Sequence, residues 1–364
     1  MNNTILELSL VKVSSVMSIK SHLNFNLLLI LLALFISCSQ PLSATENHSW
    51  LPSIDNFRYA IDISVRPQLE LRQDDYSHIE SIGLDTHKVF TSKNGGDIAT
   101  LIVQGYFTKL NDITMHPPFY NGPNDVKFIC RICNLNVTVL DQGKLNLRMG
   151  HAEIPFGLEY NQDTNGTLRQ YSNGRDLGNK LDWGLAANGK LAWGGYELSL
   201  SQGAGVDWKS DRQSYIVSGR VEKTNSYSSI IGLSAFYGHL RSPASSADFI
   251  NRSRIGLDGS QQWRNMTFLA EASAGKDDDT KRFMLLLEAD IHSANEKWLT
   301  YLQLKNTSLK ATHHSWDSVR QSSLGMRFTV NNAWTLSGQW THDLTVFNNA
   351  EKKSMLELQA RFRF

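Results

Sequence analysis

The sequence predicts an all-β protein, a transmembrane antiparallel up-and-down β-barrel of about 16 strands. Apolar and polar residues alternate with a period of two along most of the chain after residue 56, as expected of strands with two unlike faces. The alternating segments have roughly the 9–11 residues that a tilted strand needs to cross a bilayer. An apolar segment typical of export signals precedes them.

The composition supports this class and excludes several others. Hydrophobic residues make up 41% of the 364 residues and charged residues 20%. That is too polar for a bundle of membrane-spanning helices and too apolar for a disordered chain. Lys and Arg number 36 against 35 Asp and Glu, so no overall charge attracts nucleic acid. Three cysteines are too few for a disulfide scaffold.

Residues 1–44 are predicted to be a signal peptide. The apolar run from Leu27 to Ile36 is too short to span a membrane, but it suits the core of a secretory signal. Pro41 ends the run, and the small residue Ala44 marks the expected cleavage.

Two alternatives concern this leader. Met17 is an alternative start, and the residues before Cys38 are close to a lipoprotein processing site. With cleavage at Ala44, residues 45–56 form a short lead and residues 57–364 form the barrel.

Strands are expected wherever the alternation recurs. It is clearest in six segments: 59–65, 145–149, 196–200, 283–291, 324–330 and 356–364. It is noisier in ten others: 86–92, 97–108, 126–140, 181–191, 214–223, 228–239, 252–263, 266–275, 297–306 and 332–342. Turn-forming residues separate many of them: Asn94–Gly96, Asp141–Gly143, Asn188–Gly189, Lys276–Asp279 and Asn331–Asn332. Short turns between consecutive strands predict a meander in which sequence neighbours pair.

A soluble sandwich or propeller would also alternate. Propeller blades would repeat every 40–50 residues or so, and no such repeat is present. Tryptophans near strand ends favour a membrane barrel, whose interfaces carry aromatic girdles: Trp183, Trp193, Trp208, Trp263, Trp298, Trp334 and Trp340. The final residues, Phe362 and Phe364, lie in register with the apolar face. This ending resembles the signal by which bacterial outer-membrane barrels are recognised for assembly, which implies lipid and the assembly machinery as partners.

One stretch resembles a particular family. Leu147–Glu159 reads L-R-M-G-H-A-E-I-P-F-G-L-E, and Gly174–Gly178 follows as G-R-D-L-G. This pattern resembles the phosphate-selective porin family of the O/P type over about 30 residues. The resemblance implies a trimeric outer-membrane barrel of 16 strands, whose inward loops narrow the pore and favour anions.

The physics of the motif leaves two interpretations open. Pro155 cannot donate to a strand ladder and Gly157 relaxes the backbone, so the strand ends or kinks there. Residues 158–180 are then a long loop. It either folds into the barrel as a constriction, with Arg169, Arg175 and Asp176 as candidate residues, or forms a corner needed for folding alone.

The polar face carries both signs of charge. Its basic residues are Arg148, Arg220, Arg252, Arg254, Arg327, Arg361 and Arg363. Its acidic residues are Asp62, Asp182, Glu197, Asp258, Glu271, Glu288, Asp290 and Glu357. The seven arginines, Glu288 and Glu357 are the candidate pore-lining residues. We expect most of these charges to solvate the wall or pair with one another, although Arg252 and Arg254 are close enough for a local anion filter.

Other residues of chemical interest have simpler explanations. Cys130 and Cys133 lie three apart, so a bridge between them within a strand would require a turn or bulge. The C-x-x-C pair also weakly resembles barrels that sheathe multihaem cytochromes. His313–His314 with Asp317, and the acidic run Asp277–Asp279, are expected to lie in solvated turns. No residues predict a catalytic centre, a metal site or a cofactor.

These observations predict a porin of the bacterial outer membrane that is not an enzyme. It would be a homotrimer without nucleic-acid partners, and small solutes, with anions as candidates, would diffuse passively through it. A structural sheath around an exported protein such as a multihaem cytochrome is the alternative, and a barrel enzyme is a weaker one.

Overall fold

The computed structural model describes most of the chain from Phe57 to Phe364. The described residues leave out 1–56, 93–95, 112–125, 141–142, 163–166, 172–175, 207, 209–212, 227–228, 243–244, 312–313 and 348–349. The predicted signal peptide and lead, Cys38, Arg175 and His313 therefore lie outside the described residues.

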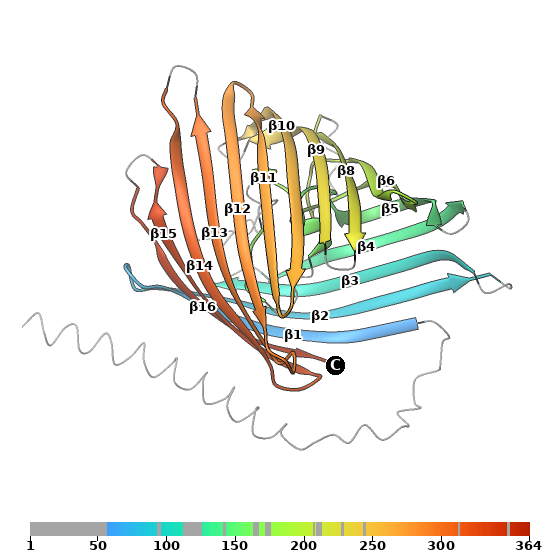
Figure 1. The fold of residues 1–364 in the computed structure, drawn as a ribbon, viewed down its shortest axis with the longest axis horizontal. Helices are drawn as coiled ribbons and strands as arrows, with labels where there is room; N and C mark the ends of the chain where they lie inside the picture. The colour runs from blue at the N-terminus through green and yellow to red at the C-terminus, as the bar shows by residue number, and fades with distance from the viewer. Residues whose placement is uncertain are drawn as a thin grey trace, which may run out of the picture. The chain divides into compact units, whose positions relative to one another are not determined.

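Sixteen antiparallel strands form one closed barrel (Figure 1), which confirms the predicted fold class. The first eight strands are β1 (Phe57–Glu70), β2 (Asp75–Thr91), β3 (Asp97–Asn111), β4 (Val126–Leu140), β5 (Leu145–Glu153), β6 (Leu181–Leu191), β7 (Gly194–Ser201) and β8 (Tyr215–Ser226). The second eight are β9 (Ser229–Ser242), β10 (Ser245–Trp263), β11 (Met266–Asp277), β12 (Thr280–His292), β13 (Trp298–Lys310), β14 (Asp317–Thr329), β15 (Trp334–Thr345) and β16 (Ser354–Arg363).

Each strand pairs with its neighbours in sequence, and β1 pairs with β16 to close the sheet. At this seam the backbone groups of Ile61 and Phe364 exchange two hydrogen bonds of 2.8 and 2.9 Å. Closure leaves no free strand edge, so ladder groups on every strand find partners within the sheet.

Within the described residues, no helix is long and apolar enough to span a bilayer. The short 3₁₀ helix η2 (Leu158–Asn161) lies between β5 and β6.

The predicted turn at Asn188–Gly189 is wrong. Both residues lie inside β6, where Asn188 pairs with Asn146 of β5 and donates its side-chain amide to Asn136 at 3.1 Å. Gly189 is needed there because a Cβ would lie 2.2 Å from the backbone oxygen of Lys144. The chain instead turns between Leu191 and Gly194.

The two faces of the sheet have the predicted phase. Apolar side chains face outward on every clearly alternating segment, and Leu198, Ile255 and Leu358 are at least half exposed. All eight acidic residues predicted for the polar face are buried inside the barrel. The inner wall is therefore polar, and the outer wall is the surface that lipid would cover.

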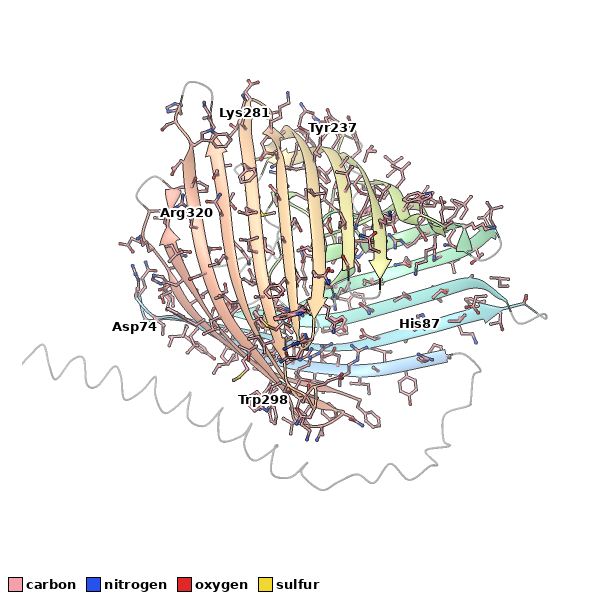
Figure 2. The ribbon with its side chains drawn as sticks, in the orientation of Figure 1. Asp74, His87, Tyr237, Lys281, Trp298 and Arg320 are labelled. Carbon is pink, nitrogen blue, oxygen red and sulfur yellow. A yellow bond between two sulfur atoms is a disulfide. The ribbon has the colours of Figure 1, made fainter. Side chains whose placement is uncertain are left out.

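Aromatic side chains gather at the end of the barrel that holds the C-terminal end of β16 and the first residues of β13 and β15. Trp298 stacks on Phe328 with ring centroids 4.2 Å apart. The ring centroids of Trp334 and Phe362 lie 5.1 Å apart. Figure 2 places Trp298 at this end, with Lys281 at the other end of the same wall. These rings form the expected interfacial girdle.

Cys130 and Cys133 form a disulfide, with Cα atoms 6.1 Å apart. The pairing of β3 with β4 shifts register here: Gln104 pairs with Ile132, whereas Gly105 pairs with Cys130. This β-bulge leaves Arg131 as an extra residue, so positions three apart reach the same face. The bulge is the feature that the sequence analysis required for a bridge.

We expect the disulfide to be present in protein purified without reductant. Alkylation of the denatured chain should leave Cys130 and Cys133 unmodified. When the chain is reduced first, alkylation should add one alkyl group to each of them. Peptide mass spectrometry measures this directly, and modification of Cys130 or Cys133 before reduction would contradict the assignment.

Candidate functional site

The segment between β5 and β6 folds into the barrel. Its ends are joined where the Ile154 N–H donates to the Lys180 carbonyl at 3.0 Å. The Lys180 ammonium also pairs with the Glu159 carboxylate at 2.7 Å. Residues 154–180 are here called the inner loop. From this closed base, its described residues (154–162, 167–171 and 176–180) lie against the inner face of β7–β13.

The first attachment of the inner loop is apolar. Phe156 is completely buried, and it packs where Gly256 leaves room, since a Cβ there would lie 2.7 Å from the ring. The cluster around it joins three loop residues to three wall residues: Ile154, Phe156 and Leu177 with Ile216, Phe236 and Leu240. Burying these side chains holds both ends of the inner loop on β8 and β9.

Gly157 brings the loop backbone onto the wall. Its φ of 61° lies in the left-handed region, and its N–H donates to the Ser234 hydroxyl at 3.1 Å. The next N–H, of Leu158, donates to the Glu271 carboxylate at 2.7 Å. A Cβ on Gly157 would lie 2.4 Å from that carboxylate, so only glycine fits.

The second attachment is at Arg169. Its guanidinium donates to Glu288 and Asp290 at 2.8 Å each and lies 5.6 Å from the centre of the Tyr301 ring. Tyr171 donates its hydroxyl to Glu288 at 3.1 Å. Burial first, and then the Glu288 carboxylate, raise the pKa of the Tyr171 phenol, which keeps its proton for this bond.

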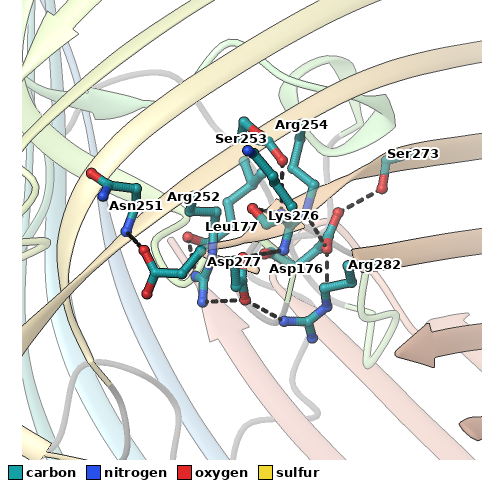
Figure 3. A network of polar contacts seen from close by, with 11 residues as sticks. Asp176, Leu177, Asn251, Arg252, Ser253, Arg254, Ser273, Lys276, Asp277 and Arg282 are labelled. Carbon is teal, nitrogen blue, oxygen red and sulfur yellow. Dashed lines mark hydrogen bonds and ion pairs between the residues drawn. The ribbon is translucent and has the colours of Figure 1, made fainter. Parts of the chain in front are cut away.

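The third attachment is at Asp176, in the network of Figure 3. Arg254 donates to Asp176 at 2.9 Å and to Asp277 at 2.8 Å, and the Ser273 hydroxyl donates to Asp176 at 2.6 Å. Arg252 donates to the Leu177 carbonyl at 2.6 Å and to Asp277 at 2.8 Å. Multiple charge-assisted hydrogen bonds of this kind fix the position of the inner loop on the wall and stabilise the folded barrel.

Tyr160 of η2 attaches the loop to the next strand of the same wall, β7. Its hydroxyl donates to Glu197 of β7, which also pairs with Arg148 of β5. Burial, followed by the nearby Glu197 charge, raises the pKa of Tyr160. The inner loop is thus attached along one continuous arc of the wall, from β7 to β13.

Most predicted wall arginines are bound to carboxylates. Arg220 pairs with Asp258, Arg361 with Asp62, and Arg363 with Asp85 at 2.9 Å. Arg327 lies half-buried on the inner face of β14. Glu357 accepts from the amides of Gln68 and Gln339 at 2.6 and 3.1 Å, and Glu288 holds Arg169.

The suggestion of an open anion filter at Arg252 and Arg254 needs correction. Their side chains are 5% and 0% exposed, and both are occupied by Asp277 and the inner loop. Asp277 was expected in a solvated turn, but it ends β11 and takes part in this network.

The sequence analysis missed the apolar residues of the inner wall. They break the alternation by placing apolar side chains on the polar face, and each touches the inner loop cluster: Ile216, Phe236, Leu240, Leu269, Met284 and Leu286. The signal was in the sequence, because Met284 and Leu286 share a face with Glu288.

A gap remains between the inner loop and the wall that faces it. It has a volume of about 40 Å³ and lies between Gln170 of the loop and strands β13–β16. The wall contributes amides, hydroxyls and two charges of each sign: Gln321, Gln339, Ser323, Thr341, Lys305, Lys353, Asp343 and Glu357. This polar gap is suited to water.

No family model and no curated protein matches the chain. Solved structures do. OprB of Pseudomonas putida matches with a TM-score of 0.63 at 9% identity, over 85% of this chain and 94% of that one. The chain has the fold of outer-membrane barrel proteins. An anion-selective porin from Comamonas acidovorans matches with a TM-score of 0.55 at 13% identity, over 85% and 99% of the two chains.

These matches leave one expectation unconfirmed and correct another. Resemblance to porins is supported at the level of fold, but the phosphate-selective family is not confirmed. The prediction that the chain is not an enzyme is wrong, because the matched structures do not support it. OmpT with loop L8 deleted, an outer membrane protein of Vibrio cholerae, matches with a TM-score of 0.60 at 9% identity, over 85% and 99% of the chains. The neighbours therefore include proteins other than those named as porins, and the fold does not exclude catalysis.

Proposed function

We propose that the protein is an outer-membrane porin, a water-filled channel for passive diffusion of small solutes. One observation carries the proposal: a closed barrel has a polar inner wall and a firmly attached inner loop that leaves a polar gap. An outward apolar surface with an aromatic girdle supports residence in a membrane. The fold likeness to porins supports an outer-membrane location, reached through the predicted signal peptide, and a homotrimeric state.

The inner loop argues against a sheath around another protein. A sheath needs an empty lumen, whereas the described residues of the inner loop lie in this one and are attached to its wall at several places. We therefore favour diffusion of small solutes over enclosure of an exported cytochrome.

We propose a weak preference for anions. The gap has balanced charges, but four arginines lie together on the inner face of β14, β16 and β1: Arg66, Arg327, Arg361 and Arg363. Two carboxylates, Asp62 and Asp85, bind this group. With Glu357 of β16 also on this face, four arginines stand against three carboxylates. This small excess of positive charge would raise the concentration of anions near the wall.

Planar-bilayer recording of the refolded protein tests the channel. Discrete single-channel steps are expected, and their absence from fully folded protein would overturn the proposal. Under a KCl gradient, the reversal potential should show chloride to be more permeant than potassium. Arg66→Gln with Arg327→Gln should reduce the permeability ratio by about twofold, because the local potential falls.

The matched control removes positive charge from the outside of the barrel. Lys109→Gln with Lys223→Gln alters exposed outer positions on β3 and β8 and should leave the reversal potential unchanged. An equal shift in both variants would show that the wall arginines do not set the preference.

A further inference from the structure

A row of lysines crosses three strands on the outer face. Lys276 of β11 pairs in register with Lys281 of β12, and Lys281 pairs with Lys310 of β13. Lys276 and Lys281 are exposed, and Lys310 is half-buried. Successive residues of a strand face opposite sides of the sheet. Asp277, the residue after Lys276, is bound inside the barrel by Arg254, so the row faces outward.

Like charges directly opposite each other on adjacent strands are destabilising. None of the three lysines forms an ion pair with another residue in the part of the chain that the structure describes. Asp278 and Asp279 lie in the turn from β11 to β12, and the Asp278 carboxylate accepts the backbone N–H of Asn251. The row thus presents concentrated positive charge that an external anion would relieve.

The position of the row indicates which anion. Lys281 lies at the end of the wall opposite the aromatic girdle (Figure 2), beyond the lipid-facing apolar band. Lysines at that depth can extend their ammonium groups to the level of lipid headgroups. The phosphate of a membrane lipid would therefore meet all three ammonium groups at once.

An apolar groove begins beside the row. It has a volume of about 760 Å³ on the outer face of β7–β11, and it reaches Ser253 and Ala274. Ser253 pairs directly with Lys276, and Ala274 is the next outward residue below it. Small residues form the floor at Gly219 and Ala235, which leaves space for a hydrocarbon chain.

We propose that the lysine row and this groove together form a binding site for an anionic, phosphate-bearing membrane lipid. The phosphate lies on Lys276, Lys281 and Lys310, and an acyl chain lies in the groove. A second copy of the chain bound about a two-fold axis is a poorer occupant, because that contact would bring three more lysines against the first three. The site is separate from the lumen and does not depend on the proposed channel.

Native mass spectrometry of the full, folded protein in detergent tests the site. The probes are phosphatidylglycerol and phosphatidylcholine with identical acyl chains. We expect phosphatidylglycerol to be retained about fivefold more than phosphatidylcholine, since only its headgroup carries net negative charge. The triple variant Lys276→Gln, Lys281→Gln, Lys310→Gln should retain both lipids equally.

Two further variants separate the parts of the site. The control Lys109→Gln, Lys223→Gln, Lys297→Gln removes three exposed lysines that do not pair with one another, and it should keep the preference. Ala274→Phe fills the groove and should lower retention of both lipids while the preference for phosphatidylglycerol persists.

Three results would overturn the proposal. The first is equal retention of the two lipids by the parent protein. The second is loss of preference in the control triple variant. The third is retention of inorganic phosphate as strong as that of phosphatidylglycerol, which would identify a free anion as the ligand. Single-channel conductance, measured in the same preparations, reports separately on folding and on the proposed channel.

Discussion

A channel carrying Gly157→Ala is expected to conduct about twofold more current than the parent, with added noise, because its inner loop no longer rests on the wall. The added Cβ would lie 2.4 Å from the Glu271 carboxylate, and φ at this position is 61°. A left-handed conformation costs an alanine about 1–2 kcal/mol before the clash is counted. The hydrogen bonds from Gly157 and Leu158 to Ser234 and Glu271 would be lost together.

The measurement is single-channel conductance at fixed salt and voltage. Gly219→Ala is the matched control, since its Cβ would meet neighbours no closer than 3.4 Å and it faces lipid. That variant should conduct like the parent. If Gly157→Ala kept the parent conductance and noise while remaining folded, the inner loop would not be the constriction.

Arg254→Ala is expected to lower the free energy of unfolding by about 3 kcal/mol, the typical cost of removing one partner from a buried ion pair. Arg254 is fully buried, and its loss would leave Asp176 and Asp277 with fewer cations in a place without ready access to water. Arg282 also contacts both carboxylates, at 3.4 Å from Asp176 and 3.3 Å from Asp277. These contacts are longer than those of Arg254, so Arg282 would replace only part of the lost interaction.

Urea titration of the barrel in lipid vesicles measures this change. The control is Arg363→Ala, whose side chain is 41% exposed, and its pair with Asp85 should contribute less than about 1 kcal/mol. Equal losses in the two variants would show that the network of Figure 3 adds no stability beyond that of an exposed pair.

The strands were predictable because a barrel wall has lipid on one side and water on the other. That contrast imposes a period of two on each strand. The period correctly predicted which residues of β12 and β16 face outward. The turn at Asn188–Gly189 was mispredicted because Asn-Gly is a local signal, whereas the tertiary contact of Gly189 with Lys144 decides its conformation.

The inner loop was only half predictable. The motif around Pro155 marked where the strand ends, but the wall positions that receive the loop looked like errors in the alternation. Met284 and Leu286 acquire meaning only once Leu158 and Tyr171 are brought against them. Likewise, the bond from Arg254 to Asp176 joins residues 78 positions apart, and no local pattern encodes such a pairing.

The seam between β1 and β16 has a consequence for how the molecule is made. Gln68 and Glu357, which meet there, are 289 residues apart, so joining them carries a large entropic cost that earlier hairpins do not share. The receiving surface for the inner loop, in contrast, spans only the contiguous arc β7–β13. We infer that an open, curved sheet can already accept the loop, and that zipping the two outermost strands together afterwards seals it inside.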